Sequence, residues 1–367
     1  FLCAALVMGQ SNIPAGATLG SNHNSRSADG EMLAGRGFWP GLCVSTKHNS
    51  RFASFTMLGK GDYNYEMDIQ IPFSLVSQDE GENCLQILPG YWFLYNFYAL
   101  ERNAWKYKNR DHREEKIQRL EFDYLAPDTV NELMNAMKIM QMAVGKAWYK
   151  NNKEVEQTEN DLLNKGNYLL ENNDETIDAL LILVNGFENS KRKTVLLKTR
   201  MAYNVFKKMI RYYAILQFVE FLETQDGKAF ASLKKLAISN TKEEKWENIG
   251  GQLLPKSKLD QLLKKIKSGT INSWESLHKN YVKAGEEYAS DKMKHGLSVL
   301  QIILGKKINA LTKTDLKNLL EEAIGTRKWI AENVVASREK DYSNPFIIMM
   351  HYLFYELQCP CCNCFFL

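Results

Sequence analysis

Two copies of one tetrapeptide contain the residues best suited to chemistry. His23-Asn-Ser-Arg26 recurs as His48-Asn-Ser-Arg51, 25 positions later. A histidine can act as a general base near neutral pH because its unperturbed pKa is about 6.5. An arginine can bind phosphate oxygens bidentately. The pair of tetrapeptides therefore predicts a site that deprotonates a hydroxyl or amine beside a phosphorylated small molecule.

Other residues near the two tetrapeptides complete this candidate site. The loop between Gly37 and Gly41 carries aromatic rings that could stack on a base or a sugar. The predicted catalytic base is His48, with His23 as the second choice. The predicted ligands of substrate and anion are Arg26, Arg36, Trp39, Lys47, Asn49, Arg51 and Lys60. In the alternative interpretation the histidines and asparagines only satisfy backbone groups at turns, and the arginines are solvated.

The elements that must position these residues follow a hexapeptide rhythm. Val7, Ile13 and Leu19 recur at a spacing of six, and small or turn-forming residues lie between them. This spacing is typical of a left-handed parallel β-helix, in which one aliphatic side chain per short strand points inward. Val44 precedes His48 by four positions, as Leu19 precedes His23. We therefore expect the two tetrapeptides to stack in adjacent coils, separated by an insertion at 34–41.

Beyond about residue 100 the hydrophobic period becomes helical. The predicted fold class is thus a β-helix fragment followed by an all-α helical domain. Helices are expected over 127–150 with Asp128 as N-cap, and near 153–171, 174–185, 190–225, 257–267, 272–304 and 313–340, with Thr312 opening the last. The predicted domains are β-helix coils with an aromatic end cap (1–100), a charged connecting helix (101–126), a helical domain (127–345) and an abnormal Cys-rich tail (346–367).

Composition limits the class of protein. The chain has 367 residues, 45% of them hydrophobic and 25% charged, which excludes wholesale disorder. Charges of both signs are spread along the chain and leave a net charge of +4, so we expect no nucleic-acid partner. No apolar run approaches the roughly 18 residues of a membrane span, and we expect a cytoplasmic protein without a membrane partner.

The two ends of the chain are unusual. The chain begins at Phe1 inside the patterned segment, which indicates the C-terminal part of a longer protein. Four of the seven cysteines lie between Cys359 and Cys364. Their two overlapping C-x-x-C pairs could bind Zn²⁺, but four thiolates within six residues would make a cramped tetrahedral site. We therefore predict no metal site, and interpret the tail as an abnormal terminus.

Three motifs resemble a large uncharacterised bacterial family. They are Gly35-Arg-Gly-Phe-Trp-Pro-Gly41, Lys47-His-Asn-Ser-Arg51 and Leu58-Gly-Lys-Gly-Asp-Tyr63. The resemblance covers roughly residues 1–345 and implies a left-handed β-helix of the trimeric acyltransferase-like superfamily, joined to a helical C-terminal domain of unknown function. It implies transferases that act on acyl-CoA, acyl-carrier or nucleotide-sugar substrates, often as trimers. One histidine acts as base in such enzymes, and His23 and His48 match it here.

The predicted function is therefore a transferase of this class, acting on a sugar, a nucleotide-sugar or an acyl thioester. Acyl-CoA or a nucleotide-sugar would be a substrate, and no cofactor is firmly implied. The expected partners are a phosphorylated small molecule and further copies of the chain, with a trimer favoured. The alternative function is a non-catalytic binding or oligomerisation module.

Overall fold

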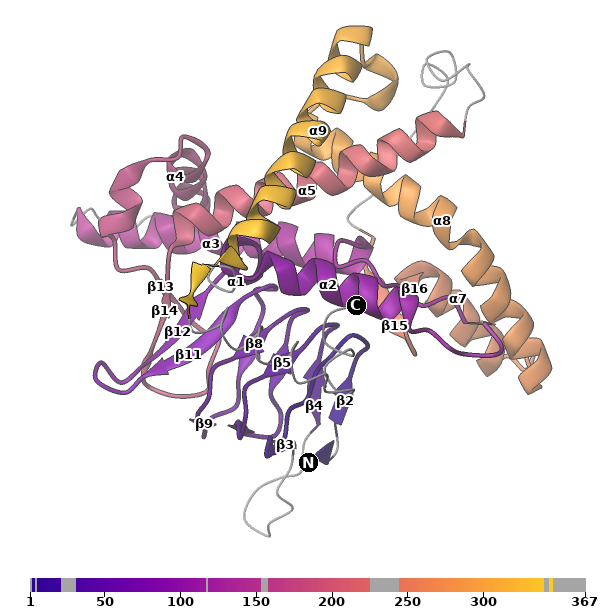
Figure 1. Ribbon diagram of the computed structural model, residues 1–367, viewed down its shortest axis with the longest axis horizontal. Coiled ribbons are helices and arrows are strands. Elements are labelled where there is room, and N and C mark those ends of the chain that lie inside the picture. The colour runs from indigo at the N-terminus through magenta and orange to yellow at the C-terminus, as the bar shows by residue number, and fades with distance from the viewer. Residues whose placement is uncertain are drawn as a thin grey trace.

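The structure is a computed structural model that describes residues 2–3, 5–20, 31–116, 118–152, 158–224, 244–339 and 343–345. Short strands come first in the chain and helices follow, lying along one side of the strands (Figure 1). His23, Arg26 and the Cys-rich tail lie outside the described residues. The stacking of His23 on His48 therefore stays a prediction.

The strands before the first helix are short and mostly parallel. They are β1 (Leu2–Cys3), β2 (Ala5–Val7), β3 (Leu19–Gly20), β4 (Met32–Ala34), β5 (Trp39–Pro40), β6 (Ser45–Thr46), β7 (Arg51–Phe52), β8 (Met57–Leu58), β9 (Asp62–Tyr63), β10 (Asp68–Ile69), β11 (Leu75–Asp79) and β12 (Cys84–Leu88). One parallel sheet has the order β10-β7-β4-β2. Its register pairs Arg51 with both Leu33 and Asp68, so these three side chains form one row.

Each strand buries one face, and hydroxyl side chains close the turns. Met32, Ala34 and Phe52 are buried. Arg51, which precedes Phe52 in β7 and belongs to the row on the other face of the sheet, is exposed. The Ser50 hydroxyl donates to the Lys47 carbonyl (2.7 Å) and accepts the Met67 N–H (3.1 Å). Ser50 therefore satisfies backbone groups at the turn that contains the second tetrapeptide.

The predicted fold class, a left-handed β-helix fragment followed by an all-α domain, is wrong. The described strands form several small sheets and no β-helix solenoid, and the second half of the chain is not purely helical but contributes strands to a mixed sheet. A six-stranded sheet has the order β13-β14-β12-β11-β8-β5. Its strands β13 (Leu183–Val184) and β14 (Lys193–Leu196) come from the region predicted to be all-α, and β11 is antiparallel to β12. An antiparallel hairpin, β15 (Trp246–Ile249) and β16 (Gln252–Pro255), lies among the helices. Strands of two to four residues are too short to interrupt a helical pattern visibly.

The helices are longer than the strands and enclose much of the core. They are α1 (Tyr91–Tyr95), α2 (Phe97–Asn109), α3 (Pro127–Asn151), α4 (Glu159–Glu171), α5 (Thr199–Glu223), α7 (Lys256–Lys267), α8 (Trp274–Leu304) and α9 (Lys313–Ala336), with 3₁₀ turns at Glu175–Ala179 and Ile308–Ala310. Within the described residues, none of these helices is long and apolar enough to cross a membrane.

The helix boundaries confirm part of the sequence analysis and correct the rest. Thr312 is the N-cap of α9, as predicted, and its hydroxyl accepts the Asp315 N–H. The N-cap of α3 is Ala126, so the prediction for Asp128 is wrong. The helix predicted at 174–185 is a 3₁₀ turn followed by β13, and the helix predicted at 190–225 starts only at Thr199, after β14.

One hydrophobic core connects the strands with the helices. Its buried members run from Ala17 to Ile330. The buried aromatic residues Trp92, Phe93 and Phe97 of α1 and α2 belong to this core. The rings of Phe73 and Phe93 are 4.4 Å apart, and the rings of Phe93 and Phe206 are 6.3 Å apart. The strand turns are thereby held against α1 and α5, and this packing fixes the position of the sites described below.

Candidate functional site

Two adjoining pockets lie on the outward face of the four-stranded sheet. The larger one, here called the sheet pocket, has a volume of about 640 Å³. The smaller one, the helix pocket, has a volume of about 340 Å³ and reaches the first turns of α3 and strand β15. Both are lined by the row residues Leu33, Arg51 and Asp68. The pockets therefore form one continuous surface.

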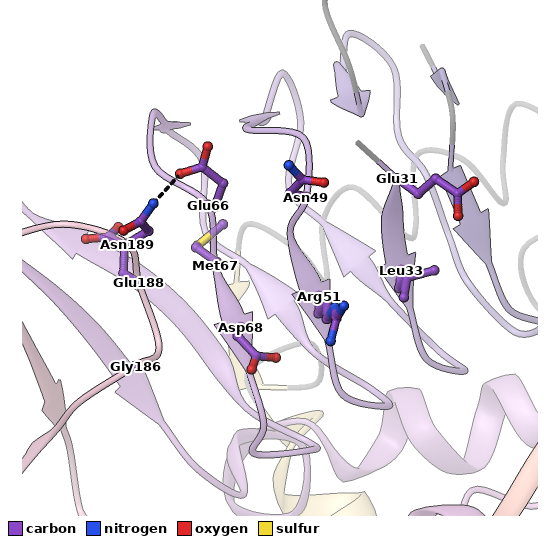
Figure 2. Close-up of a pocket in the computed structure, with 10 residues that line it drawn as sticks. All are labelled: Glu31, Leu33, Asn49, Arg51, Glu66, Met67, Asp68, Gly186, Glu188 and Asn189. Carbon is purple, nitrogen blue, oxygen red and sulfur yellow. Dashed lines mark hydrogen bonds between the residues drawn. The ribbon is translucent and has the colours of Figure 1, made fainter. Parts of the chain in front are cut away.

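The sheet pocket is acidic. Figure 2 shows the side chains of Glu31, Glu66, Asp68 and Glu188 around it, with Arg51 as the basic residue between Leu33 and Asp68. Glu66 accepts a hydrogen bond from the Asn189 amide (3.1 Å). Glu188 is paired with Arg192, so Glu31, Glu66 and Asp68 remain against Arg51. This surplus of carboxylates disfavours a phosphorylated ligand in the sheet pocket, because like charges repel.

A buried arginine ties the strands to the start of α3. The Arg36 side chain is 1% exposed, and its guanidinium makes two parallel bonds to the Asp128 carboxylate (2.8 and 2.9 Å). It also donates to the Gln10 amide oxygen and to the Asp123 carbonyl. Burial lowers the pKa of Arg36, but the charge of Asp128, the hydrogen bonds to it and the charge of Glu121 together outweigh burial and raise that pKa. Arg36 thus orients Asp128 and has little capacity left for a ligand.

Glu132 lies one helical turn beyond Asp128 and lines the helix pocket. Its carboxylate accepts the backbone N–H of Ser54 (2.9 Å), and it forms no ion pair within the described residues. Burial and the neighbouring charge of Asp128 raise the pKa of Glu132 from 4.5 to about 7, although the Ser54 hydrogen bond opposes this. Glu132 can therefore both give and take a proton near neutral pH.

Two hydrogen-bond donors in the wall of the helix pocket lack partners among the described residues. They are the indole Nε1 of Trp246 and the amide Nδ2 of Asn248, both buried and both on β15. The Asn248 side chain is otherwise fixed, since its oxygen accepts the Gly251 N–H (2.7 Å). Buried donors are usually satisfied by protein, water or ligand. An oxygen-rich ligand would satisfy both.

A second polar network supports the pocket from behind. His295 on α8 contacts the Asn131 amide oxygen through Nε2 (2.9 Å) and the Tyr213 hydroxyl through Nδ1 (3.0 Å). The amide oxygen can only accept, so Nε2 carries the proton and Nδ1 accepts from Tyr213. Burial lowers the pKa of His295 to about 4, so the ring is neutral at physiological pH. The ring of His295 also packs edge-on against Trp246.

The structure separates the residues that the sequence predicted to act together. Asn49 and Arg51 line the sheet pocket, while His48 is buried on the turn before them. Arg36 is used by Asp128, and Trp39 packs on Trp92 with ring centres 5.4 Å apart. Lys47 is half-buried and Lys60 exposed. A role for His48 as base stays a prediction.

Sequence reasoning missed the residues that make the helix pocket. Asp128 and Glu132 are four positions apart at the start of a helix, a spacing that places two carboxylates on one helical face. That signal was available. Ser54, Trp246 and Asn248 carry no local signal, since only the tertiary fold brings them to α3.

Comparisons with known proteins identify a similar domain and a similar protein, and neither has a described activity. Residues 230–344 match the family model described as a domain of unknown function (DUF6819). The chain is 38% identical over 354 residues to an uncharacterized protein of Treponema pallidum (strain Nichols), which covers 94% of this chain and 46% of that protein. The chain thus spans less than half the length of this relative. No solved structure matches the chain. These matches agree with the predicted resemblance in its coarser part: one segment matches a domain of unknown function, and the bacterial relative is uncharacterized. Nothing found supports the hexapeptide-repeat superfamily.

Proposed function

We propose that the helix pocket is an acid–base site for a neutral, hydroxyl-rich ligand of the sugar class, and that Glu132 exchanges a proton with this ligand. The observation that carries the proposal is a carboxyl group without an ion-pair partner among the described residues, beside a cavity lined in part by two residues, Trp246 and Asn248, whose buried N–H donors lack partners. Sugar hydroxyls can accept from such donors and donate to carboxylates. A cavity of about 340 Å³ lies within the usual range for small-molecule sites.

This proposal keeps the sugar substrate predicted from the sequence and changes the base. A carboxyl with a pKa of about 7 is matched to neutral pH, so it can remove a proton from an attacking hydroxyl or protonate a leaving oxygen. Arg36 holds the Asp128 carboxylate next to Glu132. The negative charge of Asp128 helps to raise the pKa of Glu132. We propose group transfer from a sugar donor as the reaction class.

Binding is tested by thermal unfolding of the chain with a panel of neutral monosaccharides and disaccharides. A ligand that binds only the folded chain raises Tm. Trp246→Phe keeps the aromatic ring and removes the indole N–H, so we expect it to reduce the Tm shift. The matched control is Trp274→Phe, because Trp274 is 77% exposed on α8 and should not alter the shift. An equal Tm shift in both variants, or none in the wild type, would refute the assignment.

Catalysis is tested by incubating the chain with the sugar donors that bind and detecting products by mass spectrometry. Loss of a general acid or base typically costs 10²–10⁴ in rate, so we expect Glu132→Gln to lose at least about a hundredfold while still binding. Glu275→Gln, at the exposed start of α8 and outside the pocket, should keep its turnover. If instead His48→Ala abolishes turnover and Glu132→Gln does not, His48 is the base. Binding without turnover by the wild type would favour the non-catalytic binding module.

A further inference from the structure

The connection between α7 and α8 forms a tip on the far side of the β15–β16 hairpin from the N-terminal strands (Figure 1). Helix α7 has no buried residue. After it, the Ile271 N–H bonds back to the Lys265 carbonyl (3.1 Å), and the Ile271 side chain is buried. Helix α8 then starts at Trp274, with Ser273 as its N-cap. The turn therefore brings the start of α8 close to the end of α7.

Three large apolar side chains at this tip are exposed to solvent. Leu263 is 51% exposed, Ile266 is 41% exposed and Trp274 is 77% exposed. Leu263 and Ile266 are three positions apart in α7 and so share one helical face. The Trp274 ring meets the His278 ring, at 6.2 Å. We call these three residues the tip apolar residues.

The same tip is positively charged. Residues 263–274 contain Lys264, Lys265 and Lys267 and no acidic residue. These tip lysines form no ion pair within the part of the chain that the structure describes, whereas Lys256 and Lys258 earlier in α7 are paired with acidic side chains. The tip thus combines three unpaired cations with three exposed apolar groups.

This combination favours one kind of partner. Amphipathic helices with lysines on one face and Leu, Ile or Trp on the other lie in the headgroup region of membranes, and tryptophan is enriched there. A second copy of the tip would place cations against cations. An acidic protein surface would pair the lysines, whereas a phospholipid surface also takes up the exposed Trp274 ring.

We propose that the α7–α8 tip binds peripherally to an anionic phospholipid surface, with the tip apolar residues entering the headgroup region and the tip lysines contacting anionic headgroups. This proposal changes the sequence-based expectation of no membrane partner. It is independent of the helix pocket, because none of the tip residues lines that pocket.

The test is co-sedimentation of the full chain with phosphatidylcholine vesicles, with and without phosphatidylserine. We expect binding only to the anionic vesicles, and weaker binding as salt screens the lysines. A lysine near an anionic surface contributes about 1 kcal/mol, or about fivefold in partitioning. Replacing all three tip lysines by glutamine should therefore lower partitioning by about a hundredfold. The control variant Lys146→Gln/Lys317→Gln/Lys328→Gln removes three exposed lysines on other helices and should retain binding.

A second variant tests insertion. Trp274→Ser should lower partitioning while leaving Tm unchanged, because the side chain is mostly exposed. The proposal fails if anionic vesicles do not sediment the chain, if the control variant loses as much binding as the tip variant, or if Trp274→Ser binds like the wild type. Capture by polyglutamate without vesicle binding would assign the tip to an acidic protein and would also overturn the proposal.

Discussion

Replacing Glu132 by glutamine should make the chain more stable at neutral and alkaline pH. The folded state raises the pKa of this carboxyl from 4.5 to about 7 because of burial and the charge of Asp128. Between these two pH values the folded chain binds more protons than the unfolded chain, so the free energy of unfolding decreases as pH rises. Above pH 7 the penalty is complete and stays constant.

The size of the effect follows from the pKa shift. One pKa unit corresponds to about 1.4 kcal/mol, so a shift from 4.5 to about 7 costs up to about 3 kcal/mol. Glutamine has nearly the same shape and its amide oxygen can still accept the Ser54 N–H. The variant should match the wild type near pH 4.5 and exceed its stability by up to about 3 kcal/mol above pH 7.

Urea unfolding of both proteins over this pH range measures the difference directly, since all other titrating groups cancel. If the difference for Glu132→Gln varies by less than about 0.5 kcal/mol across the range, the carboxyl titrates normally and the acid–base site loses its basis. If Glu132→Gln is more stable than the wild type but inactive, the Glu132 carboxyl lowers the stability of the fold in exchange for activity, as catalytic groups commonly do.

Three further outcomes test the packing around the site. Arg36→Ala should reduce the free energy of unfolding by about 3–5 kcal/mol, measured in urea, because Asp128 would remain buried without its partner. Gly145→Ala should lower Tm by forcing a methyl group onto the backbone of α4, at a cost of about 1–3 kcal/mol, while Gly325→Ala, with open space around it, should raise Tm slightly. The wild type should lose up to about 3 kcal/mol more than His295→Gln between pH 6.5 and pH 4, since burial lowers the pKa of His295 to about 4 and protonation favours the unfolded chain.

The sequence predicts local features of the fold better than its assembly. Thr312 was recognisable as an N-cap from residue type alone, and Leu19 and Val44 are buried as the hexapeptide spacing predicts. Val7 and Ile13 of the same pattern are only partly buried. The strands β13 and β14 were missed because a strand of two to four residues has too few positions to show a period of two.

The candidate site depends on contacts between distant parts of the chain, and for that reason the sequence pointed elsewhere. Burial and the charge of Asp128 raise the pKa of Glu132, and its carboxylate accepts a hydrogen bond from Ser54, 78 residues away. Arg36 has the residue type of an anion ligand, but its guanidinium bonds to Asp128 and to two other acceptors. Residue type shows what a side chain can bind, whereas the fold decides whether its donors and acceptors are already satisfied. A buried polar group whose hydrogen bonds are all made within the protein stabilises the fold. A buried polar group that lines a cavity and has no ion-pair partner remains available to a ligand.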